Sequence, residues 1–96
     1  ASELESERPV LLFVGAERCV HCRKLWQLLA QGKLSSRIAQ LDTRYLDADR
    51  HQALASDLGV RGLPTLLLIK PGQLALRAPA QLSVDTLFDW LNRAAG

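Results

Sequence analysis

Two short runs of consecutive hydrophobic residues stand out along the chain. Residues 10–14 read Val-Leu-Leu-Phe-Val and are followed by Gly15, and residues 66–69 read Leu-Leu-Leu-Ile. Apolar runs of this length that end at turn residues are typical of strands buried on both faces of a sheet. Both are far shorter than the roughly 20 residues that span a bilayer. We therefore expect buried strands over residues 10–15 and 66–69.

The segment after the first strand has the spacing of an amphipathic helix. It extends from about Val20 to Gln31, and Gly32 ends it. We expect Trp26, like Trp90 later in the chain, to be a packing residue rather than a platform for a ligand. The apolar positions of the segment recur three and four residues apart: they are Cys22, Leu25, Trp26 and Leu29.

Two further helices are expected from their capping residues. Asp49 is a favourable N-cap for a short helix that runs to Leu58 and is closed by Gly59. Ser83 caps the last helix, which carries Asp85 at the positive end of its dipole. The residues that the last helix is expected to bury are Val84, Leu87, Phe88 and Leu91.

The remaining segments complete the order of elements. Residues 34–40 fit neither pattern, whereas residues 41–46 favour a strand interrupted by charge. Pro71 and Gly72 form a turn signal, so residues 73–77 are expected to return as a hairpin beside the second buried strand. The resulting order, β-α-β-α-β-β-α, predicts an α/β fold with a four-stranded mixed sheet flanked by helices.

Composition is that of a single globular domain. The chain has 96 residues, of which 48% are hydrophobic and 23% are charged, so it can bury one core. We expect residues 1–9 to be an N-terminal extension and residues 10–96 to form the domain. Twelve basic and ten acidic side chains are scattered without a block of like charge, which excludes a nucleic-acid or membrane footprint. Ala1 and the lack of methionine fit a processed chain or an excised fragment.

The two cysteines are the strongest candidates for chemistry. Cys19 and Cys22 lie three positions apart where strand gives way to helix, too close together for the longer loops that structural disulfides usually close. The nucleophile of disulfide exchange is a thiolate, and the unpaired N–H groups and dipole at a helix start stabilise an anion. We therefore predict that Cys19 attacks and that Cys22, one turn further, resolves the mixed disulfide.

Three features together resemble the thioredoxin superfamily. Phe13 to Cys22 form a strand, a short loop and a Cys-x-x-Cys helix start, residues 60–65 read Val-Arg-Gly-Leu-Pro-Thr, and residues 66–72 lead from an apolar strand toward the terminal helix. With only nine residues before the first strand, the resemblance implies the minimal core of this fold. It also implies a thiol-disulfide oxidoreductase that needs no cofactor or metal.

The resemblance further implies how substrates bind. It predicts a cis peptide bond between Leu63 and Pro64 that packs against the cysteines, with the backbone of Leu63 pairing with an extended substrate strand. The expected partners are protein thiols and disulfides and an upstream redox protein. We expect the domain to act as a monomer that does not insert into a membrane.

The match to the family breaks at three positions near the cysteines. In the alignment that the cysteines set, Phe13 stands where thioredoxins carry a buried carboxylate, and Tyr45 stands in place of a strand lysine. Arg18 replaces the aromatic residue that usually precedes the first cysteine. Glu17, the nearest acid, is the candidate proton shuttle in place of the missing carboxylate, although such a position is more often a solvent-exposed loop residue.

Neighbours of the cysteines leave the direction of electron flow open. His21, when protonated, would place positive charge beside the thiolate and resembles the centre of DsbA-type oxidants, although an exposed residue without a role is the alternative. Val20 instead resembles the reductive thioredoxin-like domains of transmembrane electron carriers. Arg18, Arg23 and Lys24 form a basic collar that favours the thiolate modestly, because exposed charges are screened.

Two other classes of function remain alternatives. Cys-x-x-Cys is also half of a zinc site, but only His21 and His51 could supplement the thiolates. A redox-inactive interaction module on the same scaffold is the other, favoured by the departures at Phe13 and Tyr45. The processed start and the histidine favour the bacterial periplasm or another extracytoplasmic space, with the cytoplasm as the alternative.

Overall fold

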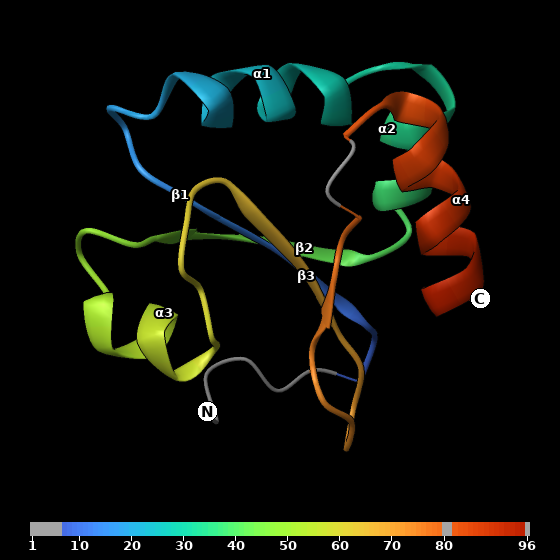
Figure 1. Cartoon of the computed structure of the whole chain (residues 1–96). Coiled ribbons are helices and arrows are strands. Elements are labelled where there is room, and N and C mark those ends of the chain that lie inside the picture. Colours follow the sequence, from blue (N-terminus) through green and yellow to red (C-terminus); the bar gives the residue numbers. More distant parts are fainter. Residues whose placement is uncertain (1–6, 80–81, 96) are drawn as a thin grey trace.

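The computed structural model describes residues 7–79 and 82–95 as a four-stranded sheet with helices on both faces (Figure 1). None of the helices in these ranges is long and apolar enough to cross a membrane. The elements in chain order are β1 (Val10–Gly15), α1 (Val20–Leu29), α2 (Gly32–Ile38), β2 (Asp42–Asp47), α3 (Gln52–Asp57), β3 (Thr65–Ile69), β4 (Leu76–Arg77) and α4 (Val84–Ala95).

Strand β1 lies inside the sheet, whose order is β2-β1-β3-β4. It pairs in parallel with β2 and antiparallel with β3, and β4 pairs antiparallel with β3. All six residues of β1 are buried, which explains why its sequence is continuously apolar rather than alternating. The mixed sheet is therefore confirmed, and the loop toward the cysteines leaves from the end of an interior strand.

The sheet has two covered faces of unequal size. Successive side chains of a strand point to opposite faces, so Leu11 and Phe13 of β1 join the core beneath α1, α2 and α4. Val10, Leu12 and Val14 join a smaller core on the opposite face, packed against residues of α3 and its flanking loops. The cysteine pair belongs to the larger of these cores.

Helix α2 is the main departure from the predicted order of elements. The order is β-α-α-β-α-β-β-α, because residues that fitted neither pattern fold as this seven-residue helix. Its sequence, Gly-Lys-Leu-Ser-Ser-Arg-Ile, has only one fully buried position, Leu34. Helix propensity is weak for glycine and serine, so packing of Leu34 into the core, rather than local preference, explains this helix.

The other predicted helix limits were partly right. Asp49 does not cap α3, which begins after His51 without a side-chain cap. Ser83 does cap α4: its hydroxyl accepts a hydrogen bond from the backbone N–H of Thr86 at 3.1 Å, and the Thr86 hydroxyl accepts one from the Ser83 N–H at 3.0 Å. Of the four residues expected to be buried in α4, Leu87 and Leu91 are buried, and Val84 and Phe88 are partly buried. Trp90 of the same helix is buried as well.

The predicted hairpin is present but shorter than expected. The Gln73 N–H donates to the Lys70 carbonyl at 3.1 Å, and Gly72 has a φ of +70°, as the third position of a type II turn requires. Only Leu76 and Arg77 pair with β3. Residues 73–75 are exposed and continue the loop instead of the strand.

Candidate active site

Cys19 and Cys22 are brought together at the start of α1, where they form a disulfide with a Cα–Cα distance of 5.2 Å. Cys19 is the N-cap of the helix, with an extended backbone conformation (φ −87°, ψ 109°). Its Sγ accepts a hydrogen bond from the Cys22 N–H at 3.1 Å. The sulfur thus occupies the position that a serine or aspartate oxygen takes in ordinary N-caps, where an anion is stabilised.

Cys22 lies on the inner side of this helix turn, where only 5% of its surface is exposed. A Cβ atom built on Gly15, at the end of β1, would lie 3.0 Å from Cys22 Sγ and 2.8 Å from Cε1 of Phe13. The same atom would lie 3.4 Å from Cε1 of Tyr45. Only glycine fits at this position without displacing a neighbour, and the buried sulfur therefore lies close to two aromatic rings.

Phe13 and Tyr45 belong to an aromatic cluster that sequence reasoning did not foresee. The Phe13 ring centroid lies 5.2 Å from that of Trp26 and 5.7 Å from that of Tyr45. The prediction that Trp26 is a packing residue was only partly right, because it packs on Phe13 but remains 56% exposed. The one available signal was strand pairing, since Phe13 and Tyr45 are directly opposite each other in the β1–β2 register.

Tyr45, whose ring packs near Phe13 and Gly15, has a perturbed ionisation. Partial burial raises the pKa of its hydroxyl, and the nearby carboxylates of Asp47, Glu17 and Asp49 raise it further. The neutral phenol is therefore favoured over a wide range of pH. Glu17 itself is exposed in the loop between β1 and α1, and its backbone carbonyl accepts a hydrogen bond from Arg23 at 3.5 Å.

Arg18, expected to add positive charge beside the cysteines, is paired with Asp49. Its Nε and Nη2 donate to the two carboxylate oxygens at 3.2 and 3.0 Å. The hydrogen bond from Arg18 lowers the pKa of Asp49. The pair joins the loop before Cys19 to the loop after β2, where the Asp47 carboxylate accepts the Asp49 N–H at 2.9 Å. The charge of Arg18 is therefore compensated within the fold.

The loop before β3 carries the predicted proline. The Leu63-Pro64 peptide bond is cis, as the family resemblance implied. Thr65 Oγ1 donates to the Gly62 carbonyl at 2.7 Å, and Arg77 from β4 donates to the Gly59 carbonyl at 2.7 Å. These two side chains hold both ends of the loop, and Arg77 was not singled out from the sequence.

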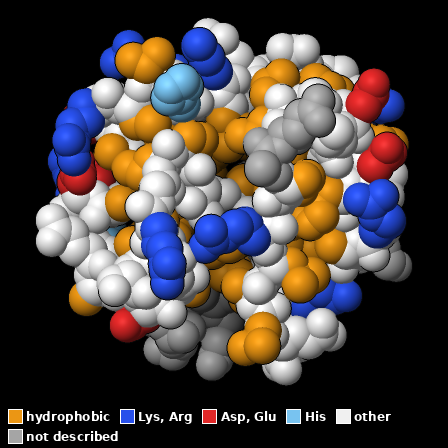
Figure 2. Space-filling view, viewed as in Figure 1, with side chains coloured by type: hydrophobic (Ala, Val, Ile, Leu, Met, Phe, Trp, Pro, Cys, Tyr) orange, Lys and Arg blue, Asp and Glu red, His pale blue; other side chains and the backbone are white. Residues whose placement is uncertain are grey.

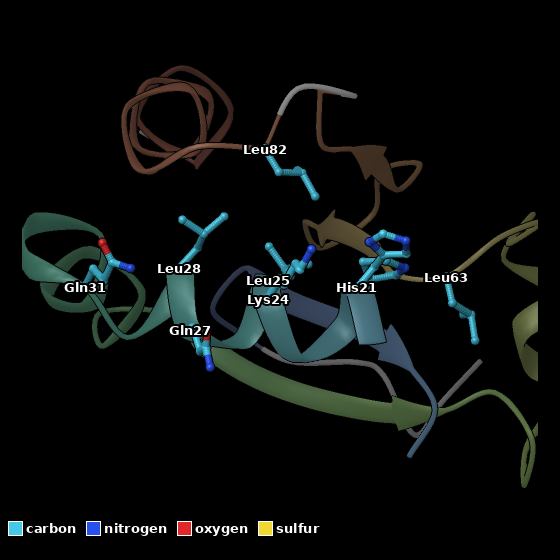
Figure 3. Close-up of a pocket in the computed structure, with 9 residues that line it drawn as sticks. His21, Lys24, Leu25, Gln27, Leu28, Gln31, Leu63 and Leu82 are labelled. Atoms are coloured by element: carbon cyan, nitrogen blue, oxygen red, sulfur yellow. The ribbon is translucent and has the colours of Figure 1, made fainter. Parts of the chain in front are cut away.

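This loop and α1 border a surface pocket of about 610 Å³. Figure 2 shows hydrophobic side chains gathered on this side of the molecule, with Lys and Arg side chains beside them. In the close-up, His21, Lys24 and Leu28 follow one another along α1, Leu82 points toward them from another segment, and Leu63 lies on the loop beyond His21 (Figure 3). The pocket is lined by His21, Lys24, Leu25, Gln27, Leu28, Gln31, Leu63, Pro64 and Leu82.

The predicted site residues thus fall into two groups. His21, Leu63 and Pro64 line one pocket beside the cysteines, whereas Glu17 lies in the exposed loop before them. Within residues 7–79 and 82–95, no three His, Cys, Asp or Glu side chains are grouped as metal ligands would be. His51, the other histidine considered for zinc, lies at the start of α3.

Comparison with known proteins gives consistent matches. The family model described as Thioredoxin matches residues 1–93. A thioredoxin from Rickettsia felis is 28% identical over 93 residues, covering 95% of this chain and 86% of that protein. A rabbit (Oryctolagus cuniculus) protein disulfide-isomerase is 31% identical over 100 residues, covering all of this chain but 20% of the isomerase.

Solved structures give the same picture of the fold. A mutant thioredoxin from Halobacterium salinarum superposes with a TM-score of 0.73 at 29% identity, covering 94% of this chain and 77% of that one. The first thioredoxin domain of mouse protein disulfide-isomerase A4 superposes with a TM-score of 0.79 at 21% identity, covering 99% and 69%. The chain thus has the thioredoxin fold of these proteins.

Proposed function

The chain belongs to the thioredoxin family and is a thiol-disulfide oxidoreductase that acts on protein thiols, and on that premise we propose that Cys19 is its nucleophile and Cys22 its resolving residue. One observation carries the assignment: Cys19 is partly exposed and accepts a backbone hydrogen bond, whereas Cys22 is buried. An attacking thiolate needs both access and stabilised charge. A resolving thiol needs only to reach the first sulfur.

The reaction consists of two displacements. The Cys19 thiolate attacks one sulfur of a substrate disulfide, and the substrate S–S bond breaks to release one substrate thiolate, which takes up a proton. The Cys22 thiol then loses its proton and attacks Cys19 Sγ, and the mixed disulfide breaks to release the second substrate thiol. Two electrons pass to the substrate, and the Cys19–Cys22 disulfide that forms is reduced again by an upstream dithiol protein.

We place the chain in the reducing direction because of the pairing of Arg18. Strong oxidants of this chemistry are those whose reduced thiolate is strongly stabilised. The cation next to Cys19 is instead held by Asp49, and Cys22 lies beside apolar rings. Apart from the positive charge that a protonated His21 would add, the Cys19 thiolate is stabilised by the helix start and its one observed N–H bond. A thiolate stabilised less strongly than in an oxidant favours the disulfide form and therefore the reducing direction.

Equilibration of the reduced chain with a glutathione or dithiothreitol buffer tests this direction. We expect a potential near that of thioredoxin, about −270 mV, whereas a value near −120 mV would identify an oxidant and overturn the reducing role. The assignment of the two cysteines is tested separately with Cys22→Ser and Cys19→Ser. The first should accumulate mixed disulfides with protein substrates and the second should not; accumulation only with Cys19→Ser would reverse the roles.

The other predicted site residues have supporting parts in this scheme. Leu63 and Pro64 are proposed to bind the substrate chain, since both line the pocket along α1 that His21, between the two cysteines, also lines. His21, exposed on the first turn of α1, is proposed to add charge beside the thiolate when protonated. Glu17 is proposed to carry protons between solvent and the cysteines. An unchanged pH profile of reduction in Glu17→Gln would remove Glu17 from the mechanism.

Oligomeric state and location complete the proposal. We propose that the chain acts as a monomer, which sedimentation at working concentration tests directly. We propose an extracytoplasmic location, because disulfides form and persist in oxidising compartments, where a disulfide reductant has its substrates. Fractionation of cells that express the full-length natural protein, with markers for each compartment, would contradict this if the protein were found only with cytoplasmic markers.

A further inference from the structure

The pocket beside α1 continues into a second hollow across the proline loop. The second hollow has a volume of about 360 Å³ and shares Leu25, Leu63, Pro64 and Leu82 with the first. It extends toward β4, where Arg77, Ala78 and Pro79 line it. The two hollows form one groove, from the flank of α1 past the cysteines' proline loop to the sheet edge, which we call the α1–β4 groove.

The charged side chains that line the α1–β4 groove are all basic. Lys24 lines its α1 part and Arg77 lines its β4 part, and no aspartate or glutamate lines either. Among the described residues, no carboxylate lies within ion-pair distance of either side chain. The floor between these cations is apolar, because leucine and proline side chains form it. A ligand that fits must therefore offer apolar contact and negative charge together.

Lys24 is the better placed of the two cations to select a ligand. Arg77 already donates to the Gly59 carbonyl and holds the proline loop, so its substitution would also disturb that loop. Lys24 is exposed on α1 one turn after His21, and it borders the pocket in the close-up view (Figure 3). It lies two residues beyond Cys22 and lines the same pocket as His21, which stands between the two cysteines.

We propose that the α1–β4 groove selects protein substrates whose reactive cysteine is flanked by an acidic and an apolar side chain, with Lys24 as the specificity-determining residue. The inference rests on the proposed function, because it supposes that a polypeptide lies beside Cys19. The apolar side chain packs on the leucine floor, and the acidic side chain pairs with Lys24 at the rim. Complementary charge at a rim acts mainly by speeding encounter, so the preference falls as salt rises.

Two disulfide-linked peptides that differ only in having Glu or Lys beside the cysteine test the proposal, with reduction followed at low ionic strength. For the unsubstituted chain we expect kcat/KM to be about tenfold higher for the Glu peptide. Lys24→Glu should reverse this order. Lys70→Glu makes the same change in net charge directly after β3, whose last residue, Ile69, is paired with Val10 at the beginning of β1, and should keep the preference for Glu.

The outcomes separate this inference from the proposed function. Equal rates for the two peptides, or the same Glu preference in Lys24→Glu, would overturn the role of Lys24 while leaving disulfide reduction intact. If Lys70→Glu lost the preference for Glu to the same extent as Lys24→Glu, the effect would come from net charge, and the proposal that the groove selects substrates would be wrong. Failure of the unsubstituted chain to reduce both peptides and the uncharged bis(2-hydroxyethyl) disulfide would contradict the proposed function itself.

Discussion

The two sulfurs of one disulfide have contrasting surroundings. Cys19 is partly exposed at a helix start, beside a groove lined by basic and apolar side chains. Cys22, one turn away, lies beneath the surface near Phe13, Gly15 and Tyr45. Substrate contacts on the exposed side are therefore separated from packing contacts on the buried side. Changes on the buried side should alter stability first, and changes on the exposed side should alter reactivity first.

Removing the central ring of the buried side should have the largest effect. Phe13→Ala deletes a fully buried aromatic side chain, and such deletions cost about 3–5 kcal/mol of unfolding free energy. Urea unfolding of the oxidised chain measures the loss. Leu74→Ala is the control, because Leu74 is 89% exposed and its removal should change little. If Phe13→Ala and Leu74→Ala lost the same free energy of unfolding, the buried side of the disulfide would not be the part that determines stability.

Adding one methyl group at Gly15 should have the next largest effect. Gly15→Ala places a Cβ against the Phe13 ring and Cys22 Sγ, and overpacking of this kind costs about 1–3 kcal/mol. Gly62→Ala is a matched control, because a Cβ there meets nothing within 4 Å and Gly62 has no positive φ. We expect thermal unfolding to shift downward for Gly15→Ala alone. If Gly15→Ala unfolded at the same temperature as the unsubstituted chain, the Phe13 ring and Cys22 would move aside at little cost, and the predicted overpacking would be wrong.

Ionisation of Tyr45 should give a smaller effect, seen only in alkali. Burial and nearby carboxylates raise its folded-state pKa above the unfolded value near 10. The folded state then holds its proton more tightly, so stability from Tyr45 is present below pH 10 and is lost as pH rises through the folded pKa. Tyr45→Phe should weaken this alkaline loss. Denaturant unfolding of both chains at neutral and alkaline pH measures this loss. If the free energy of unfolding fell equally with pH in the two chains, Tyr45 would not be its source.

Releasing Arg18 should change stability least and reactivity most clearly. Asp49 is exposed and its pKa is lowered by Arg18, so its stabilising contribution is present above its ordinary pKa and is lost as pH falls through the lowered one. Asp49→Asn should flatten that acid-side change slightly. It should also free the guanidinium of the residue that precedes Cys19, favour the Cys19 thiolate and make the disulfide more oxidising. The absorbance of the thiolate, followed against pH in the reduced forms of both chains, measures this change. Identical titration curves for Asp49→Asn and the unsubstituted chain would show that Arg18 has no influence on Cys19.

Sequence patterns predicted the interior of this fold better than its edges. The strand over residues 10–15 was predicted exactly, because burial on both faces makes every position apolar. Helix α2 was missed because its periodic signal is only one apolar pair, Leu34 and Ile38, in a segment that also holds glycine and two serines. Strand β4 was predicted too long, because the turn signal at Pro71 and Gly72 suggested pairing directly after the turn, whereas residues 73–75 have no pairing partner among the described residues.

Within the site, local signals were reliable and long-range pairings were not. The resemblance located the cysteine pair and the cis bond at Pro64 from short motifs. Arg18 was assigned to a basic collar from its neighbours in sequence, but its partner Asp49 is 31 residues away. Arg77, which holds the proline loop from 18 residues away, was not noticed for the same reason. Such contacts depend on how the elements dock, which a single sequence does not encode locally.

The β3–β4 turn offers a practical place to attach a reporter. Because β3 runs antiparallel to β1, Thr65 is paired near the cysteine end of β1 and Ile69 is paired with Val10 at the opposite end. The turn at Pro71 and Gly72 is thus displaced along the sheet by roughly five residues, about 17 Å. A fluorophore or affinity tag inserted in its exposed tip would follow the chain through a redox cycle without meeting the substrate. Immobilisation through this turn would likewise leave the reactive end facing solution.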